Sequence, residues 1–152
     1  TDEQTAAAVA SMTRLNDVAA GVALAAGATG CTDVTGFGLA GHLGRMALES
    51  GLAVTLELAD VPFLPGAIEF ASDGVMPGGS RRNLAWAHEF VDVGDHDETD
   101  QLLVADAQTS GGLVFGVDPS ETASVLAELA SSGHTAAHIG TAATGSPALL
   151  LR

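Results

Sequence analysis

The chain has 152 residues, 47% of them hydrophobic, which suits one folded domain and excludes wholesale disorder. Five Arg and no Lys stand against nineteen acidic residues, so the net charge is −14 and binding to nucleic acid or to an anionic membrane is disfavoured. We expect no membrane span and no secretory signal. A single cysteine, Cys31, excludes an internal disulfide and a cysteine zinc site, and it favours the cytoplasm.

The first half of the chain predicts helices on both sides of a glycine-rich segment. Apolar residues recur every two to four positions after Asp2, so we expect one long helix that Gly27 or Gly30 ends. In chain order we expect a helix at 2–28, an extended piece and loop at 30–38, a helix at 38–50, a strand at 53–58, a turn at 61–66 and a short helix from Pro65 to about residue 73.

The second half alternates short elements with polar turns, and Ser80 suits the N-cap of a helix. We expect a turn at 76–80, a helix at 81–90, an acidic loop at 91–100, a short apolar piece at 102–104, a polar turn at 107–112, a strand at 113–117, a helix at 119–132, and closing strands at Ile139 and 149–151. This alternation predicts a single layered domain over residues 1–152, of the α/β or α+β class.

The most informative polar segment is 32–38, Thr-Asp-Val-Thr-Gly-Phe-Gly. Asp33 precedes a loop that opens onto the helix at 38–50, and the free N–H groups at a helix start can face an anion. A carboxylate beside them can hold Mg²⁺, which takes one or two carboxylates together with phosphate oxygens. The same residues also fit a plain turn in which Asp33 caps the helix, and the spacing leaves both interpretations open.

Two further glycine-bearing segments are candidates for ligand binding. Segment 77–83 places two glycines before a helix and carries Arg81 and Arg82, so it could hold a phosphate, and a plain turn with solvated arginines is the alternative. Segment 106–112 enters a buried strand, where loops often contact ligands, but it fits an ordinary capped turn as well.

No side chain stands out as a nucleophile. The nearby charge of Asp33 raises the pKa of the Cys31 thiol, so we interpret Cys31 as a small buried residue. His42 falls one turn inside a predicted helix, where it either points at the Asp33 loop or is an ordinary core or surface residue. The acidic run at 92–100 lacks the glycine and the final Glu of a calcium loop, so we expect a solvated loop.

Four motifs follow one another along the chain in an order and at a spacing that are typical of a known family: CTDVTGFGLAGHL (31–43), VPFLPGA (61–67), PGGSRRN (77–83) and QTSGG (108–112). With MTRLND (12–17) they make nearly the whole chain resemble the C-terminal domain of selenophosphate synthetase (selenide, water dikinase). That enzyme belongs to the aminoimidazole ribonucleotide synthetase-like superfamily. The fold implied is α+β, layered α/β/α, with a mixed sheet covered by helices and a partial similarity to the ferredoxin-like topology.

The resemblance implies a chemistry that the residues alone do not name. The family makes selenophosphate, AMP and orthophosphate from ATP, selenide and water, uses Mg²⁺ and works as a homodimer. Its motif aspartate helps to hold Mg²⁺ on the ATP phosphates, and this position is Asp33 here. The other matching positions are expected to contribute to nucleotide binding: Thr32, Thr35, Gly36, His42, Asn83, Gln108, Thr109, Ser110 and Gly111.

The resemblance also implies that most of the catalytic machinery lies elsewhere. The family's reactive Cys or selenocysteine, its catalytic Lys, its Gly-rich loop and most ATP contacts belong to an N-terminal domain that this chain, which starts at Thr1 and has no Lys, does not carry. We therefore expect no catalytic residue here and no activity of the chain alone. Ala107 replaces the usual Pro before QTSGG and Ser80 replaces Thr, and we expect the loss of Pro to loosen the loop.

Two other functions stay open at this stage. The chain could be a stand-alone module that binds a nucleotide or another anion without catalysis. It could also belong to a superfamily relative that keeps the TDVTGFG loop but acts on another substrate.

Overall fold

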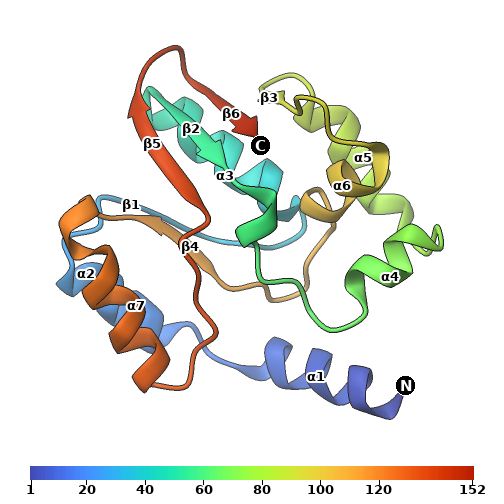
Figure 1. Ribbon diagram of the computed structural model, residues 1–152, viewed down its shortest axis with the longest axis horizontal. Coiled ribbons are helices and arrows are strands. Elements are labelled where there is room, and N and C mark those ends of the chain that lie inside the picture. The colour runs from blue at the N-terminus through green and yellow to red at the C-terminus, as the bar shows by residue number, and fades with distance from the viewer.

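The computed structural model describes residues 1–152 and contains a four-stranded mixed sheet (Figure 1). The strand order is β3–β6–β2–β5. β2 lies antiparallel to β5 and parallel to β6, and β3 lies parallel to β6. The bounds are Leu52–Leu56 for β2, Val91–Asp92 for β3, Gly140–Thr144 for β5 and Ala148–Leu151 for β6.

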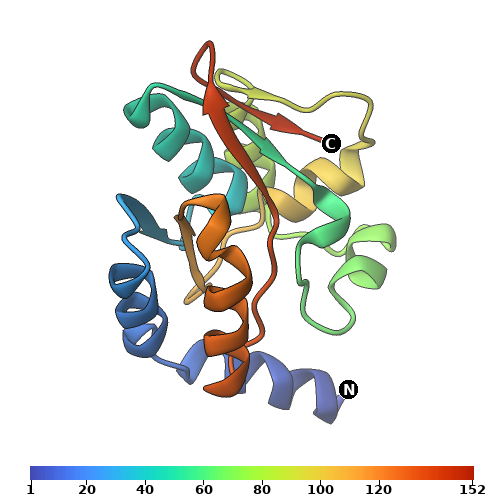
Figure 2. The same cartoon turned by 60° about the vertical axis from the view of Figure 1, so that its left-hand side comes forward.

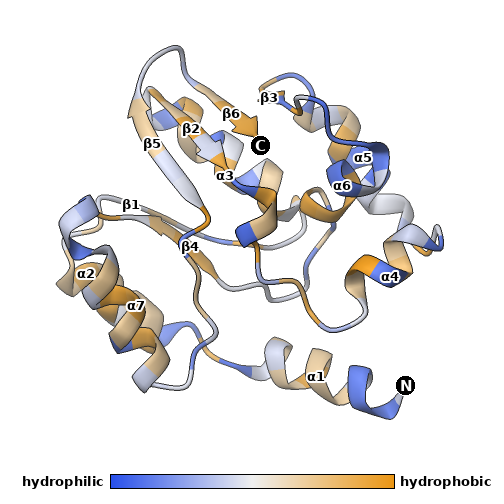
Figure 3. Ribbon diagram, in the orientation of Figure 1, coloured by the Kyte–Doolittle hydropathy of each residue, from blue (hydrophilic) through white to orange (hydrophobic).

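One face of this sheet packs against α3 (Gly38–Ser50). Side chains alternate across a strand, so Leu56, Leu149 and Leu151 all point into the same core, where they are almost completely buried. The apolar character of β6 is visible in Figure 3. α3 has the predicted bounds and ends at Gly51, which takes the left-handed conformation expected after a helix. Burial of this apolar surface is the main force that holds α3 on the sheet.

A second sheet has two antiparallel strands, β1 (Gly30–Asp33) and β4 (Leu113–Gly116). It lies between α3 on one side and the pair α2 (Asp17–Ala25) and α7 (Thr122–Ser131) on the other (Figures 1 and 2). Residues of α2 and α7 form a separate core cluster, against which Leu113 and Phe115 pack. The two-stranded sheet is thus the middle layer of an α/β/α arrangement.

Three shorter helices form a group that packs beside α3. α5 (Gly78–Ala87) contacts α3 and α6 (Glu98–Val104), and α4 (Ala67–Ser72) contacts α6. Short 3₁₀ turns occupy Leu58–Asp60 and Pro119–Glu121. α1 (Asp2–Thr13) buries no residue and lies apart from the sheets (Figure 1). No helix combines the length and the apolar character that crossing a membrane requires.

The predicted fold class is confirmed: helices pack around a mixed sheet in an α+β fold. The expected strands at 53–58, 113–117, after Ile139 and at 149–151 correspond to β2, β4, β5 and β6, with shifts of one or two residues at their ends. The helix expected at 119–132 is a 3₁₀ turn followed by α7.

The prediction of one helix over 2–28 is wrong. α1 ends at Thr13, the backbone of Arg14 is extended, and α2 begins only at Asp17. The apolar residues that suggested a single stripe do not share a buried face, because Leu15 is 72% exposed and Leu24 is 77% exposed. Packing of a buried face stabilises helices more than local preference does, and here no such face runs through the whole segment.

The N-cap predicted at Ser80 is also wrong. α5 begins at Gly78, three residues earlier than predicted, so Ser80 lies inside the helix, where it is completely buried. A hydroxyl with no access to water needs a hydrogen-bond partner, and Ser80 finds one outside its own helix.

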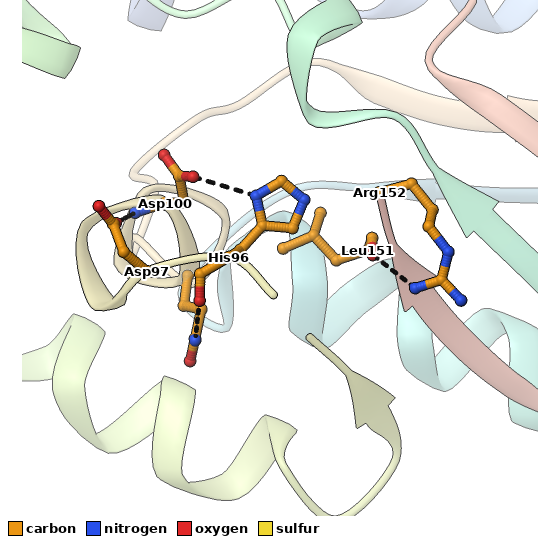
Figure 4. A network of polar contacts seen from close by, with 6 residues as sticks. His96, Asp97, Asp100, Leu151 and Arg152 are labelled. Carbon is orange, nitrogen blue, oxygen red and sulfur yellow. Dashed lines mark hydrogen bonds and ion pairs between the residues drawn. The ribbon is translucent and has the colours of Figure 1, made fainter. Parts of the chain in front are cut away.

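The acidic segment 91–100 is only partly a loop. β3 occupies its first two residues, and α6 takes in residues 98–104, including the apolar piece predicted separately. The Asp97 carboxylate caps α6 by accepting from the Asp100 N–H at 3.0 Å, and His96 Nδ1 lies 3.0 Å from Asp100 Oδ2 (Figure 4). These acidic side chains stabilise the start of a helix, where a negative charge is favourable.

Candidate functional site

Two of the three predicted loops lie side by side because β1 and β4 are paired. Asp33 stands opposite Leu113 at the ends of the strands. Beyond them, the Val34 N–H donates to Gly112 O at 3.0 Å, and the Gly111 N–H donates to Val34 O at 2.9 Å. These hydrogen bonds bring the TDVTGFG and QTSGG segments together.

The junction of these loops requires glycine at two positions. Gly38, at the start of α3, has φ 72°, and a Cβ there would lie 2.6 Å from the carbonyl carbon of Ala105. A Cβ on Gly111 would lie 2.6 Å from Val34 O. Both approaches are shorter than real Cβ contacts, so the two loops pack backbone to backbone.

The third predicted segment joins the other two through Asn83 on α5. Its side-chain amide Nδ2 donates to Gly36 O at 2.8 Å and to Ala105 O at 3.0 Å. The N–H of Gln108 donates to Thr35 O at 3.1 Å. Asn83 therefore links the two loops through their backbone carbonyls, and its donor atom is already engaged.

His42 contacts the Asp33 loop, which is one of the two positions that the sequence left open. Its Nε2 lies 3.0 Å from Thr35 Oγ1, and the imidazole is half-buried. The ring of Phe37 lies 5.8 Å from that of His42 and 5.2 Å from that of Trp86. Through these contacts His42, which belongs to α3, stabilises the Asp33 loop.

Asp33 lies at the exposed end of β1, and its carboxylate forms no hydrogen bond or ion pair within the chain. The hydroxyl of Thr32 donates to the backbone oxygen of Asp33 at 3.1 Å and leaves the carboxylate free. Thr109 is exposed and Ser110 half-buried, and neither side chain has a partner in the chain. Three side chains with potential ligand oxygens thus border the junction without an internal role.

Comparison with known proteins adds a second line of observation. A model of the family described as AIR synthase related protein, C-terminal domain, matches residues 1–149. The chain belongs to this family. The resemblance that the four motifs indicate is confirmed.

Three curated relatives of this AIR synthase related domain carry the name selenide, water dikinase. The protein of Trichlorobacter lovleyi is 42% identical over 132 residues, which are 87% of this chain and 38% of that protein. The protein of Carboxydothermus hydrogenoformans is 40% identical over 85% of this chain and 38% of its own length, and that of Cronobacter sakazakii is 40% identical over 93% and 41%. The chain therefore spans about two fifths of these relatives.

A large cavity of about 1110 Å³ borders the QTSGG loop of the domain. Gln108, Ser110 and Gly111 line it, together with residues of α1, the 61–67 segment, β4, α7 and the 134–142 segment. Asp33, His42 and Asn83 do not line it. The predicted site residues are therefore neighbours around one junction, but they do not share one pocket.

Asp106 and the buried Ser80 lie in the candidate segments 106–112 and 77–83, but sequence reasoning missed the bond between them. The Ser80 hydroxyl donates to Asp106 Oδ1 at 2.6 Å, and Gln108 Nε2 donates to Asp106 Oδ2 at 3.0 Å. Twenty-six positions separate Ser80 from Asp106, so no local pattern indicated this pair. The only local signal was an aspartate directly ahead of the polar loop.

The interpretation of Cys31 as a buried residue is wrong, because its thiol is exposed on β1. Cys31 and Asp33 alternate onto the same side of the strand. Partial burial raises the pKa of the Cys31 thiol, and the charge of Asp33 raises that pKa further. The direction of the shift agrees with the sequence argument, and it disfavours the thiolate that a nucleophile needs.

The residues at the junction suit the kind of magnesium ion that is held mainly by the oxygens of a phosphate ligand. No three His, Cys, Asp or Glu side chains come together as a protein metal site. Mg²⁺ in phosphate-binding sites takes only one or two carboxylates and completes its octahedral coordination with phosphate oxygens and water. A free, exposed carboxylate such as that of Asp33 is suited to this kind of binding.

Proposed function

We propose that this domain is the C-terminal part of an ATP-dependent selenophosphate synthetase, in which Asp33 helps to bind the phosphates of Mg-ATP. The full reaction converts ATP, selenide and water into selenophosphate, AMP and orthophosphate. The single observation that carries the proposal is that the Asp33 carboxylate lies where two loops meet and has no hydrogen-bond or ion-pair partner in the chain. The names of the relatives support the choice of substrate.

Electrostatics supports a cation-dependent site. The chain has a net charge of −14, which repels a free nucleotide polyphosphate. Bound Mg²⁺ supplies charge neutralisation on the phosphates during phosphoryl transfer. In this arrangement the Asp33 carboxylate orients the metal-bearing polyphosphate, while the open space beside Gly36 allows close approach to the backbone.

The remaining positions have supporting roles in this proposal. Asn83, Thr35 and His42 hold the two loops in place. Gln108 and Ser110, which line the cavity, and the exposed Thr109 contribute ligand-binding groups. Since the chain spans about two fifths of its relatives, we propose that the reactive Cys or selenocysteine and the catalytic Lys lie in a domain outside residues 1–152. The complete protein would work as a cytoplasmic homodimer, and the chain alone would not turn over.

A graft tests the proposal. The matched segment of the Trichlorobacter lovleyi relative is replaced by this chain, and selenide-dependent formation of AMP from ATP is measured. We expect turnover by the graft, and a loss of roughly 100-fold or more in kcat for the Asp33→Ala variant, because a preorganised charge at the reacting phosphates is removed. Asp73→Ala is the matched control, because Asp73 is also exposed and its side chain also has no partner in the chain.

Two outcomes would refute the proposal. One is an inactive graft whose folded state is confirmed by circular dichroism. The other is near-normal turnover of the Asp33→Ala graft. The free energy of unfolding of the 152-residue chain should change by less than about 0.5 kcal/mol with Asp33→Ala, because the side chain is exposed and makes no hydrogen bond or ion pair.

The alternative of a binding module without catalysis has one observation in its favour, the cavity of about 1110 Å³ beside the QTSGG loop. Calorimetry of the 152-residue chain with Mg-ATP tests it. Measurable binding by the chain, combined with a folded but inactive graft, would favour the module. Selenide-dependent formation of AMP by the complete natural protein that carries this chain excludes a relative that acts on another substrate.

A further inference from the structure

A short polar relay runs from the interior of the domain to the QTSGG loop. Ser80, on α5, is completely buried and donates its hydroxyl to Asp106 Oδ1 at 2.6 Å. Gln108 Nε2 donates to Asp106 Oδ2 at 3.0 Å and to Asp106 O at 3.3 Å. The relay thus consists of Ser80, Asp106 and Gln108.

Asp106 is half-buried and borders the cavity, and its carboxylate is engaged inside this relay. Each of its two carboxylate oxygens accepts a hydrogen bond from a side chain of the domain. An ionised carboxylate only accepts hydrogen bonds. Any polar atom that faces Asp106 must therefore be a donor.

This requirement fixes the orientation of the Gln108 amide. Its NH₂ group must face Asp106, since the carbonyl oxygen would be repelled there. The oxygen Oε1 consequently points away, and it has no partner in the chain. The only buried side-chain N or O atom without a partner is His134 Nε2, so Gln108 Oε1 is reached by solvent.

We propose that Ser80 and Asp106 are positioning residues that make Gln108 present a hydrogen-bond acceptor to the ligand. Gln108 Oε1 then accepts from an O–H group, either a water on the nucleotide-bound metal or a ribose hydroxyl, and the amide does not donate to a phosphate oxygen. The identity of the ligand rests on the proposed function. The orientation of the amide does not.

Exchanging the carboxylate and the amide between positions 106 and 108 of the graft tests whether Gln108 accepts a hydrogen bond from the ligand or donates one to it. In Asp106→Asn the new amide faces Gln108, so Gln108 turns its NH₂ outward. In Gln108→Glu two carboxylates face each other. In the double variant the asparagine amide at position 106 donates to the glutamate carboxylate at position 108, and the asparagine oxygen still accepts from Ser80. The glutamate then presents an oxygen outward, as the amide of Gln108 does in the unchanged graft.

We expect each single variant to raise KM for Mg-ATP about 10-fold, the effect of roughly one lost hydrogen bond to a ligand. The double variant should return to within about 3-fold of the unchanged graft, because internal bond and outward acceptor are both restored. A double variant no better than Gln108→Glu overturns the proposal, since a carboxylate cannot replace an NH₂ that donates to phosphate. If the relay only stabilised the fold, KM for Mg-ATP would not depend on whether residue 108 presents an oxygen outward.

A change of nucleotide distinguishes the two possible O–H donors, the ribose hydroxyl and the metal-bound water. With Mg-2′,3′-dideoxy-ATP, a ribose contact predicts equal KM for the unchanged graft and for Gln108→Met. A contact with metal-bound water predicts that the difference between them persists. Equal KM for these two proteins with Mg-ATP itself would overturn the acceptor role from either source.

The 152-residue chain tests the relay without any activity. Hydrogen exchange of side-chain NH₂ groups is followed by NMR, with Gln4 as reference because its Nε2 donates no hydrogen bond. We expect Gln108 to exchange about 10-fold more slowly than Gln4, and Asp106→Ala to abolish the difference. Equal exchange in the unchanged chain overturns the relay, whatever the graft does, whereas an inactive graft with slow Gln108 exchange overturns only the proposed function.

Discussion

Replacing Gly38 by alanine tests whether the contact between the start of α3 and the backbone of Ala105 and Asp106, just before the QTSGG loop, is as close as the structure has it. Gly38 has φ 72°, and a Cβ there would lie 2.6 Å from Ala105 C and 2.8 Å from both Ala105 O and Asp106 O. All three obstacles are backbone atoms, which cannot rotate away as a side chain can. The loop must shift, or α3 must begin later.

The magnitude follows from two separate costs. A left-handed backbone at a residue with a Cβ costs about 1–2 kcal/mol. Forcing a methyl group into a packed region costs a further ~1–3 kcal/mol, so Gly38→Ala should lower the free energy of unfolding by about 2–5 kcal/mol. Gly51 isolates the first cost, because it has φ 68° and nothing lies within 4 Å of its Cβ position. Gly51→Ala should therefore cost only about 1–2 kcal/mol.

The assay is urea unfolding of the 152-residue chain, followed by circular dichroism, for the unchanged protein and both variants. We expect the midpoint to fall further for Gly38→Ala than for Gly51→Ala, with an unchanged slope, and the melting temperatures to differ by roughly 2–12 °C. Equal losses for the two variants would refute the close contact. A Gly38→Ala variant too unstable to purify is still informative when Gly51→Ala remains folded, because the two share the same backbone strain.

Three further predictions concern single side chains. Asn83→Ala should lower the free energy of unfolding by about 1–3 kcal/mol, since two loop carbonyls lose their donor, and urea unfolding measures this loss. Asp33→Asn should lower the raised pKa of the Cys31 thiol part of the way, because burial is the larger cause of the shift, so the pH profile of thiol alkylation moves to lower pH and an unmoved profile contradicts the prediction. Ser120→Ala should raise the pKa of Asp118, because hydrogen bonds from Ser120 hold that pKa below its ordinary value. The stability that these hydrogen bonds contribute to the fold is present above the ordinary pKa of the carboxyl and is lost as the pH falls through the pKa in the folded chain. An NMR titration of the Asp118 carboxyl measures the change in pKa.

The elements that the sequence predicted well have a strong local pattern and a matching core. The helix at 38–50 has a clear apolar face and a terminating glycine, and β2 alternates as a half-buried strand does. The helix at 2–28 failed because spacing was irregular and several apolar residues stay exposed, among them Leu15. Local pattern does not report whether a partner surface exists for the whole stretch.

The candidate site was predictable in outline from its motifs, but its internal bonding was not. Asn83 was expected to bind a ligand, yet its amide connects two loop carbonyls. Ser80 was expected to cap a helix, yet it anchors Asp106 across 26 positions. Each of these bonds depends on how separate segments meet in space, which residue types and local spacing do not encode.

The bonding within the junction decides what it has left to offer a ligand. The donors of Asn83 and Gln108 are used inside the domain, whereas the carboxylate of Asp33 and the amide oxygen of Gln108 are not. Both unused groups are acceptors, and they belong to a chain whose net charge is −14. A bare phosphate meets only repulsion from these two groups, whereas a polyphosphate that carries a hydrated divalent cation brings positive charge and O–H donors to both. These two unused acceptors therefore support the metal-bearing ligand that we propose for this junction.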